Sequence, residues 1–475
     1  MNDYDNEKER HHCGIAGDAW TGTFSGKVSD FLRLMLSEDV TYVNRKSCQS
    51  LNTPIMSLCP MYAAYTLLYR IKGSTCLVHG PIGCSMNRNI VSFLGGEIQY
   101  LAPEICDPSE HKAYTTNINE QDIIFGGEEK LFDAIVEITN RISPKVIWVF
   151  RTCPTSITGD DVTSVAARAQ KKTGCTVKGI NCEGLKNADW RKGYSLAYEK
   201  LLEMVKEPEL KNDAVNIINM ASVTRADMNE FDRVFSQMDI APRYMPYYSS
   251  IDEIEKAAES SFNAVICGSG GNFFAGMMKE KFNMDYVSGL QPLGIGESRK
   301  WFGSIAEIAG KGKKVVSDEA DSARREIEKY KELLNGKRAF IAGGAERVLA
   351  VLNFCIETGM KPIGISLYHC EKNTAFRLKE ITDEYGADFQ IFAGQNLHEQ
   401  EMFLKETKVD LFLGNRMVNN RIIALNVPSM PLNNYGSTGP HLGFKGALSF
   451  ASQMAKAVMS PRALILDKLA EYLNE

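Results

Sequence analysis

The sequence predicts an α/β protein built from three Rossmann-like domains, each a mainly parallel sheet flanked by helices. Short, continuous apolar runs such as residues 145–151 alternate with helical segments along most of the chain. Such runs are typical of strands buried on both faces of a parallel sheet. The chain of 475 residues is too long for a single core and fits three such units.

The expected organisation is an N-terminal arm at 1–46 and domains at 47–212, 213–337 and 338–475, the second of which ends in a charged linking helix. Expected strands are 75–78, 145–151, 176–181, 214–220, 264–266, 338–342, 362–367, 389–392 and 410–413. Expected helices are 31–36, 159–172, 227–237, 251–260, 273–282, 318–337, 346–357 and 446–458. Acidic residues in the first turn support the helix at 159–172, because they complement the helix dipole.

Composition excludes several functions. The net charge of −5 argues against binding to nucleic acid or to an anionic membrane surface. The chain lacks an apolar run of about 18 residues, and residues 1–10 lack the apolar core of a signal peptide. We therefore expect a cytoplasmic protein with neither nucleic acid nor membrane as a partner.

The common motifs for nucleotides and hydrolysis are missing. There is no G-x-x-x-x-G-K-[ST] sequence, so the chain carries no P-loop for ATP, and there is no G-x-S-x-G elbow. Gly343-Gly344 after an expected strand is not the G-x-G-x-x-G fingerprint of a dinucleotide site. Function must be sought elsewhere, and the cysteines are the remaining signal.

Twelve cysteines occur without a single Cys-x-x-Cys pair, so a metal site must gather them from distant loops. Cys84 and Cys153 follow expected strands, Cys59 precedes an expected helix, and Cys267 follows a strand of the second domain. Ligands of open α/β sheets bind at the carboxyl ends of the strands. This pattern predicts two sites, one from the first three thiols and one at Cys267.

Buried, structural thiols are the alternative to metal ligation. We expect that simpler role for Cys175, Cys182, Cys355 and Cys370. Cys48 and Cys76 lie close in sequence to the first site, where packing and cluster tuning both remain open. Three thiolates cannot complete a larger iron-sulfur cluster, so a partner subunit would have to supply the rest.

The same residues resemble the alpha-type subunit of the component 1 family of nitrogenases and nitrogenase-like reductases. The resemblance covers nearly the whole chain after the arm. It rests on the motif at 79–84 (HGPIGC), Cys153-Pro154 with 157–161, the segment 181–184, Pro292-Leu293-Gly294 beyond Cys267, and the block 439–446.

The resemblance implies the cofactors. Cys59, Cys84 and Cys153 would give their thiolates to a P-cluster-type 8Fe-7S cluster shared with a partner subunit. Cys267, followed by Gly268, would be the thiolate of a complex iron-sulfur cofactor, similar to the L-cluster or to the FeMo-cofactor, with its heterometal left open.

The resemblance also implies the partners. They are a homologous beta-type subunit, giving an α2β2 heterotetramer, and an iron protein that hydrolyses MgATP. The missing P-loop agrees with ATP being bound by that separate protein.

Departures from the family pattern concern the cofactor pocket. Asn433 stands where molybdenum nitrogenase has a histidine ligand, and asparagine is the weaker ligand for a soft metal. His441 matches a second, non-ligand position only after a slip of one residue in the alignment. Trp190 and Tyr194 stand where the nitrogenase pocket has glutamine and histidine. We expect these four residues to line the reaction site.

Three hypotheses follow. The first is the catalytic subunit of a nitrogenase-like reductase, such as the methylthio-alkane reductases, because an aromatic pocket suits a less polar substrate. The second is a scaffold for cofactor assembly that holds a cofactor precursor. The third is a nitrogenase alpha subunit that reduces dinitrogen. The protochlorophyllide-type reductases fit less well, since Cys267 implies a bound cluster.

Overall fold

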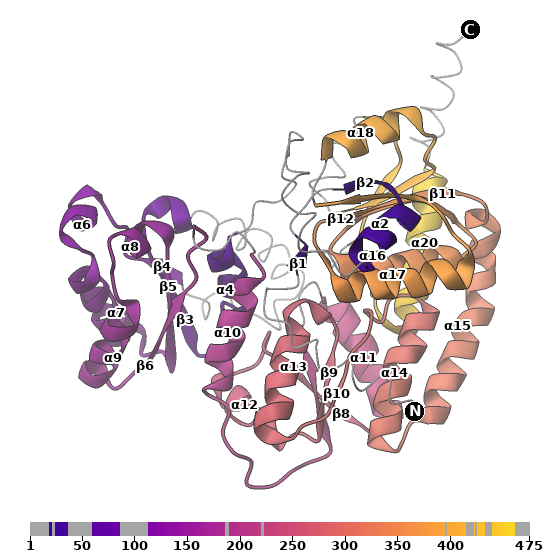
Figure 1. Ribbon diagram of the computed structural model, residues 1–475. Coiled ribbons are helices and arrows are strands. Elements are labelled where there is room, and N and C mark those ends of the chain that lie inside the picture. The colour runs from indigo at the N-terminus through magenta and orange to yellow at the C-terminus, as the bar shows by residue number, and fades with distance from the viewer. Residues whose placement is uncertain are drawn as a thin grey trace.

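The computed structural model describes residues 19–20, 24–36, 59–85, 113–185, 190–219, 223–394, 397–414, 422, 425–432 and 439–460. Three sheets with flanking helices dominate these residues, and Figure 1 shows the first at the left, the second below and the third at the right. The predicted α/β class is therefore confirmed.

The first sheet has the order β4-β3-β5-β6, and all its neighbouring strands are parallel. Residues of β5 alternate between its faces: Ile147 and Val149 pack toward α7 and α9, whereas Trp148 and Phe150 pack toward α4 and α10. The elements of this unit are α4 (Pro60–Leu68), β3 (Ser74–His79), β4 (Ala113–Thr115), α6 (Glu120–Phe125), α7 (Glu128–Ile142), β5 (Val146–Arg151), α8 (Cys153–Ile157), α9 (Val162–Thr173), β6 (Thr176–Asn181) and α10 (Lys192–Leu202).

The second sheet has the order β10-β9-β7-β8 and is also parallel. The long helix α15 follows it and packs against α14 and α20. The elements are β7 (Ala214–Ile218), α11 (Arg225–Gln237), β8 (Ala241–Met245), α12 (Ile251–Glu255), the 3₁₀ turn η1 (Ala257–Glu259), β9 (Phe262–Val265), α13 (Gly268–Phe282), β10 (Tyr286–Val287), α14 (Ile295–Ala309) and α15 (Lys313–Leu334).

The third sheet has the order β16-β15-β11-β12-β14-β2, in which β2 of the N-terminal arm is the antiparallel edge strand. A second short strand of the arm, β1 (Ala19–Trp20), pairs with β13 (Cys370–Glu371). The other elements are β2 (Phe24–Lys27), α2 (Val28–Leu36), β11 (Arg338–Gly343), α16 (Ala345–Glu357), β12 (Lys361–Leu367), α17 (Lys372–Tyr385), β14 (Gln390–Ala393), α18 (Leu397–Glu406), β15 (Leu411–Gly414), β16 (Ser429–Pro431) and α20 (Gly443–Val458).

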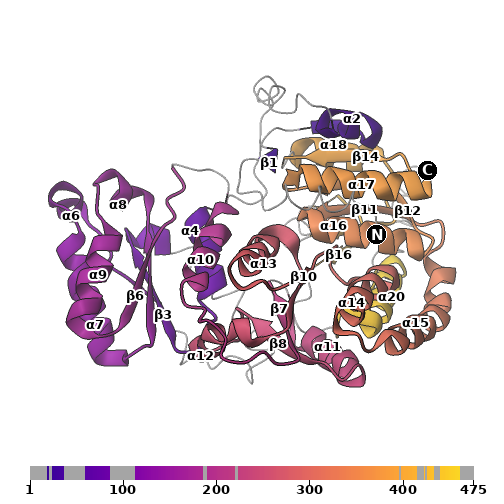
Figure 2. The same ribbon diagram turned by 60° about the horizontal axis from the view of Figure 1, so that its bottom comes forward.

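Helix α10 joins the first unit to the second, since it packs against both α4 and α13, and the two ribbon views agree on this (Figure 2). The contact with α4 requires glycine at position 193. A Cβ atom at Gly193 would lie 1.9 Å from the carbonyl oxygen of Pro60. This close approach sets where the start of α4, and Cys59 before it, sit relative to α10.

Two expected helices begin five residues earlier than predicted. The helix predicted at 318–337 is α15, which begins at Lys313. The helix predicted at 273–282 is α13, which begins at Gly268 and has Cys267 as its N-cap. Glycines lower helix propensity, which misled the prediction. Here they are needed for close packing, because a Cβ atom at Gly271 would lie 2.7 Å from a methyl carbon of Val265.

The three expected domains each contain one of the sheets, with β2 added to the last, while their boundaries stay a prediction. In the parts of the chain that the structure describes, no helix combines the length and the apolar character needed to span a membrane.

Candidate functional site

The first candidate site lies at the carboxyl end of the first sheet. His79, Arg151 and Asn181 are register partners across β3, β5 and β6, so the segments that follow them leave the sheet at one edge. Cys84 follows β3 in one helical turn, and Cys153 is the first residue of α8. Cys59 reaches the same edge as the N-cap of α4.

The three thiols of this site lie close enough to influence each other. Burial raises the pKa of Cys59, and the neighbouring Cys153 raises it further. Burial also raises the pKa of Cys84, followed by the effects of Cys153 and Cys59. A Cβ atom at Gly184 would lie 3.3 Å from Cβ of Cys59 and 4.0 Å from Sγ of Cys153, so glycine leaves open the space between them. The structure thus brings together the thiols that the sequence grouped.

A buried polar network fixes the turn that carries Cys84. The imidazole of His79 donates from Nε2 to Asp160 Oδ2 at 2.8 Å. The hydroxyls of Thr152 and Thr155 donate to the carbonyl oxygen of His79 at 2.9 and 3.0 Å. Burial lowers the pKa of His79 despite the nearby carboxylate of Asp160. The network therefore connects the turn before Cys84 to the residues on both sides of Cys153.

The turn after β6 is held by an ion pair. Arg151 Nη2 donates to Glu183 Oε1 at 2.7 Å, and Ser156 donates to the same oxygen at 3.1 Å. The backbone amide of Leu185, two residues after Glu183, donates a hydrogen bond to Sγ of Cys153 at 3.4 Å. The segment 182–185 therefore forms one wall of the thiol site.

Exposed apolar side chains surround the thiols. Ile82 lies in the turn before Cys84, Ile157 in the helix begun by Cys153, and Leu185 beside that cysteine; their exposed fractions are 57, 75 and 69%. Grouped large apolar side chains of this kind are typical of protein–protein interfaces. The edge that carries the thiols is thus suited to a partner.

The second candidate site is centred on Cys267, which leaves the carboxyl end of β9 as the N-cap of α13. The side-chain amide of Asn219 donates to the Cys267 carbonyl oxygen at 2.8 Å, which fixes the backbone at the thiol. Tyr198 and Tyr247 lie near: burial raises the pKa of both hydroxyls, and the charge of Cys267 adds to the effect.

Tyr194 and Trp190 form an aromatic wall at this site. Burial raises the pKa of Tyr194 to about 12, although a hydrogen bond with Thr66 opposes the rise, and Cys267 again adds to it. The rings of Trp190 and Tyr194 meet edge to face, with centroids 5.5 Å apart. Gly270 of α13 leaves room for the wall, because a Cβ atom there would lie 3.0 Å from Cβ of Tyr194. Both predicted pocket residues are therefore grouped with Cys267.

Two residues of the third unit join this site, and sequence reasoning missed them. His369 meets Trp190 edge to face, with ring centroids 5.9 Å apart. Glu346 accepts a hydrogen bond from the backbone of Gly268, and burial raises the pKa of its carboxyl to about 7. Glu346 lies three residues after the end of β11, and His369 lies two residues after the end of β12. The carboxyl ends of both strands face the site. That position in the sheet was the available signal.

Of the two remaining predicted residues, the structure describes only His441, and its contacts within the described part of the chain lie away from Cys267. His441 lies between α11 and α20: its backbone amide donates to Asp227 at 2.7 Å, and its ring shares a hydrogen bond with Gln453 and packs on Phe450. Burial lowers the pKa of His441 to about 4. Asn433 lies outside the described residues, as does Cys48.

The other described cysteines outside the two sites are buried. Cys76 lies in the middle of β3, where burial strongly raises its pKa. The buried position predicted for Cys175, Cys182, Cys355 and Cys370 is confirmed.

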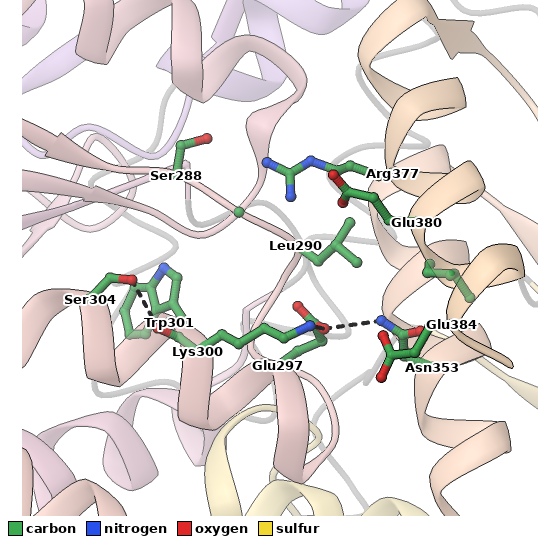
Figure 3. A pocket seen from close by; sticks show the side chains of 12 residues that line it. Ser288, Leu290, Glu297, Lys300, Trp301, Ser304, Asn353, Arg377, Glu380 and Glu384 are labelled. Carbon is green, nitrogen blue, oxygen red and sulfur yellow. Dashed lines mark hydrogen bonds and ion pairs between the residues drawn. The ribbon is translucent and has the colours of Figure 1, made fainter. Parts of the chain in front are cut away.

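A separate cavity of about 410 Å³ lies between α14 and α17. Figure 3 shows Arg377 and Glu380 on one side and Glu297 and Lys300 on the other. Arg377 also lies near enough to Glu346 to oppose the rise of its pKa. Arg377 therefore links the lining of this cavity to Glu346 of the second site.

The thiols of the first site suit an iron-sulfur group. Within the described residues, no three His, Cys, Asp or Glu side chains are grouped so that they could hold one metal ion. Thiolates are the usual protein ligands of iron-sulfur clusters, and the gap left by Gly184 provides space beside two of them. The residues of the first site therefore fit a group larger than one ion.

Comparison with known proteins identifies the family. A family model described as nitrogenase component 1 type oxidoreductase matches residues 59–459. The chain belongs to this family. The fold agrees: the solved structure described as nitrogenase Cp1 at pH 6.5 superimposes with a TM-score of 0.73 over 87% of this chain and 92% of that one, at 21% identity.

Relatives within the family have different roles. The nitrogenase iron-molybdenum cofactor biosynthesis protein NifE of Methanococcus maripaludis is 26% identical over 429 residues, covering 87% of this chain and 86% of that protein. The nitrogenase molybdenum-iron protein alpha chain of Methanosarcina barkeri is 26% identical over 458 residues, covering 82% and 83%. Membership of the family is therefore compatible with both a role in cofactor biosynthesis and a role as a nitrogenase-type subunit.

Proposed function

We propose that this chain is the catalytic alpha-type subunit of a nitrogenase-like reductase. Electrons from an ATP-hydrolysing iron protein would enter at the Cys59, Cys84 and Cys153 site and be used at the Cys267 site to reduce a small substrate. The observation that carries the proposal is the pair of thiol sites, one on an apolar exposed edge and one enclosed by an aromatic wall.

At the first site, Cys59, Cys84 and Cys153 would hold a P-cluster-type cluster that a beta-type subunit completes. The exposed side chains of Ile82 and Ile157 support a partner at this edge. Iron-sulfur groups at the two sites would supply the one-electron transfer chemistry. The network around His79 would hold the thiols in place as the partner binds.

At the second site, Cys267 would hold a complex iron-sulfur cofactor. The aromatic rings of Trp190 and Tyr194 argue for a substrate of low polarity on that side of the site. Burial raises the pKa of Tyr194 to about 12, so its hydroxyl carries no charge at neutral pH.

A cofactor-assembly scaffold is the second candidate, supported by the similarity to NifE proteins. A scaffold must release its cofactor. Here the wall spans units, because Trp190 contacts His369, and Arg191 pairs with Glu371 at 2.5 Å. These contacts would have to break for a cofactor to leave, which favours the reductase.

The test uses the chain purified with its partner subunit and its iron protein. The reductase role predicts MgATP-dependent formation of a reduced product, for example methane from dimethyl sulfide, abolished by Cys153→Ala and by Cys267→Ala. If the complex instead transfers its cofactor to a nitrogenase lacking one and reduces no substrate with reductant and MgATP, the scaffold role replaces it.

A further inference from the structure

His369 brings an imidazole to the aromatic wall of the Cys267 site. It lies in the turn between β12 and β13, and its ring stands edge to face on Trp190 at 5.9 Å and an interplanar angle of 81°. Trp190 in turn contacts Tyr194, whose hydroxyl lies within the electrostatic reach of Cys267. The imidazole is thus linked to the thiol through Trp190 and Tyr194.

The position of His369 is fixed from several directions. The next two residues form β13, which pairs with β1. Glu371 is bound to Arg191, the residue after Trp190. A Cβ atom at Gly344, the N-cap of α16, would lie 3.4 Å from Cε1 of His369, so the ring lies over the start of that helix. A side chain held in this way can keep one orientation toward a substrate.

We propose that His369 is the proton-donating side chain of the reaction at the Cys267 site. The inference rests on the proposed function, and it names a residue that the family motifs did not single out. Trp190 and Tyr194 cannot exchange protons readily near neutral pH, because the indole does not titrate and the phenol is held protonated. Imidazole is the side chain suited to that task between about pH 5 and 8.

With dimethyl sulfide, a probe of low polarity, two electrons and two protons cleave one carbon–sulfur bond and give methane and methanethiol. The electrons come from the iron protein. The imidazolium of His369 gives one N–H proton to the substrate atom that receives electrons, becomes neutral, and takes a proton from water before the next transfer.

Other titratable and charged groups stand around this site and must be separated from His369 in any test. They are Tyr194 on α10, Cys267 before α13, Glu346 on α16, Arg377 on α17, and the Arg191–Glu371 pair. Changing His369 alone leaves all of them in place.

The experiment compares the wild-type complex with His369→Gln, and with His398→Gln as a control, because His398 is an exposed histidine on α18 of the same unit. Iron content, the pH dependence of methane formation from dimethyl sulfide, and the pH dependence of the electron paramagnetic resonance signal of the reduced complex are measured. We expect wild-type iron in all three proteins, but at least a tenfold lower rate at pH 6 and a flattened pH profile in His369→Gln only.

Each outcome decides the proposal. If His369→Gln keeps the wild-type rates and pH profile, His369 is not the donor, while the reductase function stands. If the wild-type complex forms no product, the proposed function fails, and the resonance signal decides about His369. If the resonance signal of His369→Gln no longer changes with pH, the result supports an imidazole that faces the site. If the signal still changes with pH as in the wild type, the proposal for His369 is overturned.

Discussion

Asp160 and His79 form a buried pair, with 2.8 Å between Oδ2 and Nε2, at the residue where β3 ends and the turn to Cys84 begins. Asp160 also accepts from the backbone amide of Gly127, and Thr158 donates to it from the other side. The carboxylate therefore joins three loops at the carboxyl edge of the first sheet. Its removal tests whether this network supports the thiol site.

Asp160→Asn is expected to destabilise the protein by about 3 kcal/mol, because it removes one partner of a buried charged network. Unfolding in guanidinium chloride measures the change. Asp161→Asn is the matched control: Asp161 is the N-cap of α9, asparagine caps equally well, and its unfolding free energy should change by less than about 0.5 kcal/mol. Equal stability of the two variants would show that the His79–Asp160 pair does not stabilise this edge of the sheet.

Gly193→Ala is expected to cost about 3 kcal/mol, because its new methyl group would overlap the Pro60 carbonyl and separate α10 from α4. The iron content of the first site should fall as well, since Cys59 caps α4. Gly303→Ala on α14, where no heavy atom lies within 4 Å of the added carbon, should instead stabilise the protein by about 0.5–1 kcal/mol. Unchanged melting of Gly193→Ala would contradict the close approach.

His441 predicts a pH-dependent stability. Its folded pKa of about 4 lies below the ordinary value of 6.5, because burial disfavours the charged ring. The unfolded chain therefore binds the proton first, so stability is complete above pH 6.5 and falls as the pH drops toward 4. The loss amounts to about 3 kcal/mol. His441→Gln should remove this part of the slope in unfolding experiments between pH 4 and 7, and an unchanged slope would disprove it.

The apolar edge predicts a binding defect. Ile157→Asp should weaken association with the partner subunit by at least about tenfold, because a charge would be buried at the centre of the interface. Leu210→Asp is the control, since Leu210 is 82% exposed in the loop between α10 and β7, away from the thiols. Sedimentation of the mixed subunits distinguishes the two, and equal binding of both variants would place the interface elsewhere.

The sequence was sufficient for the inner strands of the three sheets and for the grouping of the thiols, but it did not predict the edge strands β2, β4, β8, β10 and β16. Apolar runs such as 145–151 marked buried strands, and residues after parallel strands had to meet at one edge, which is where Cys84 and Cys153 lie. The antiparallel strand β2 could not be predicted, because the sequence of four residues does not determine which distant sheet edge they pair with.

The pocket was only half predictable. Trp190 and Tyr194 were found through a family pattern, whereas Glu346 and His369 come from a unit whose contact with Cys267 depends on how the units pack. The start of α13 was misjudged because packing of Gly271 on Val265, a tertiary effect, outweighs the poor helix propensity of glycine.

The most direct test of the two-site account is the iron content of the purified complex with its partner subunit. Cys267→Ala should lose the iron of one site while the resonance signal of the other remains, and Cys153→Ala should do the reverse. Cys355→Ala, which changes a fully buried thiol on α16, should keep wild-type iron. Wild-type iron content in Cys267→Ala would contradict the account.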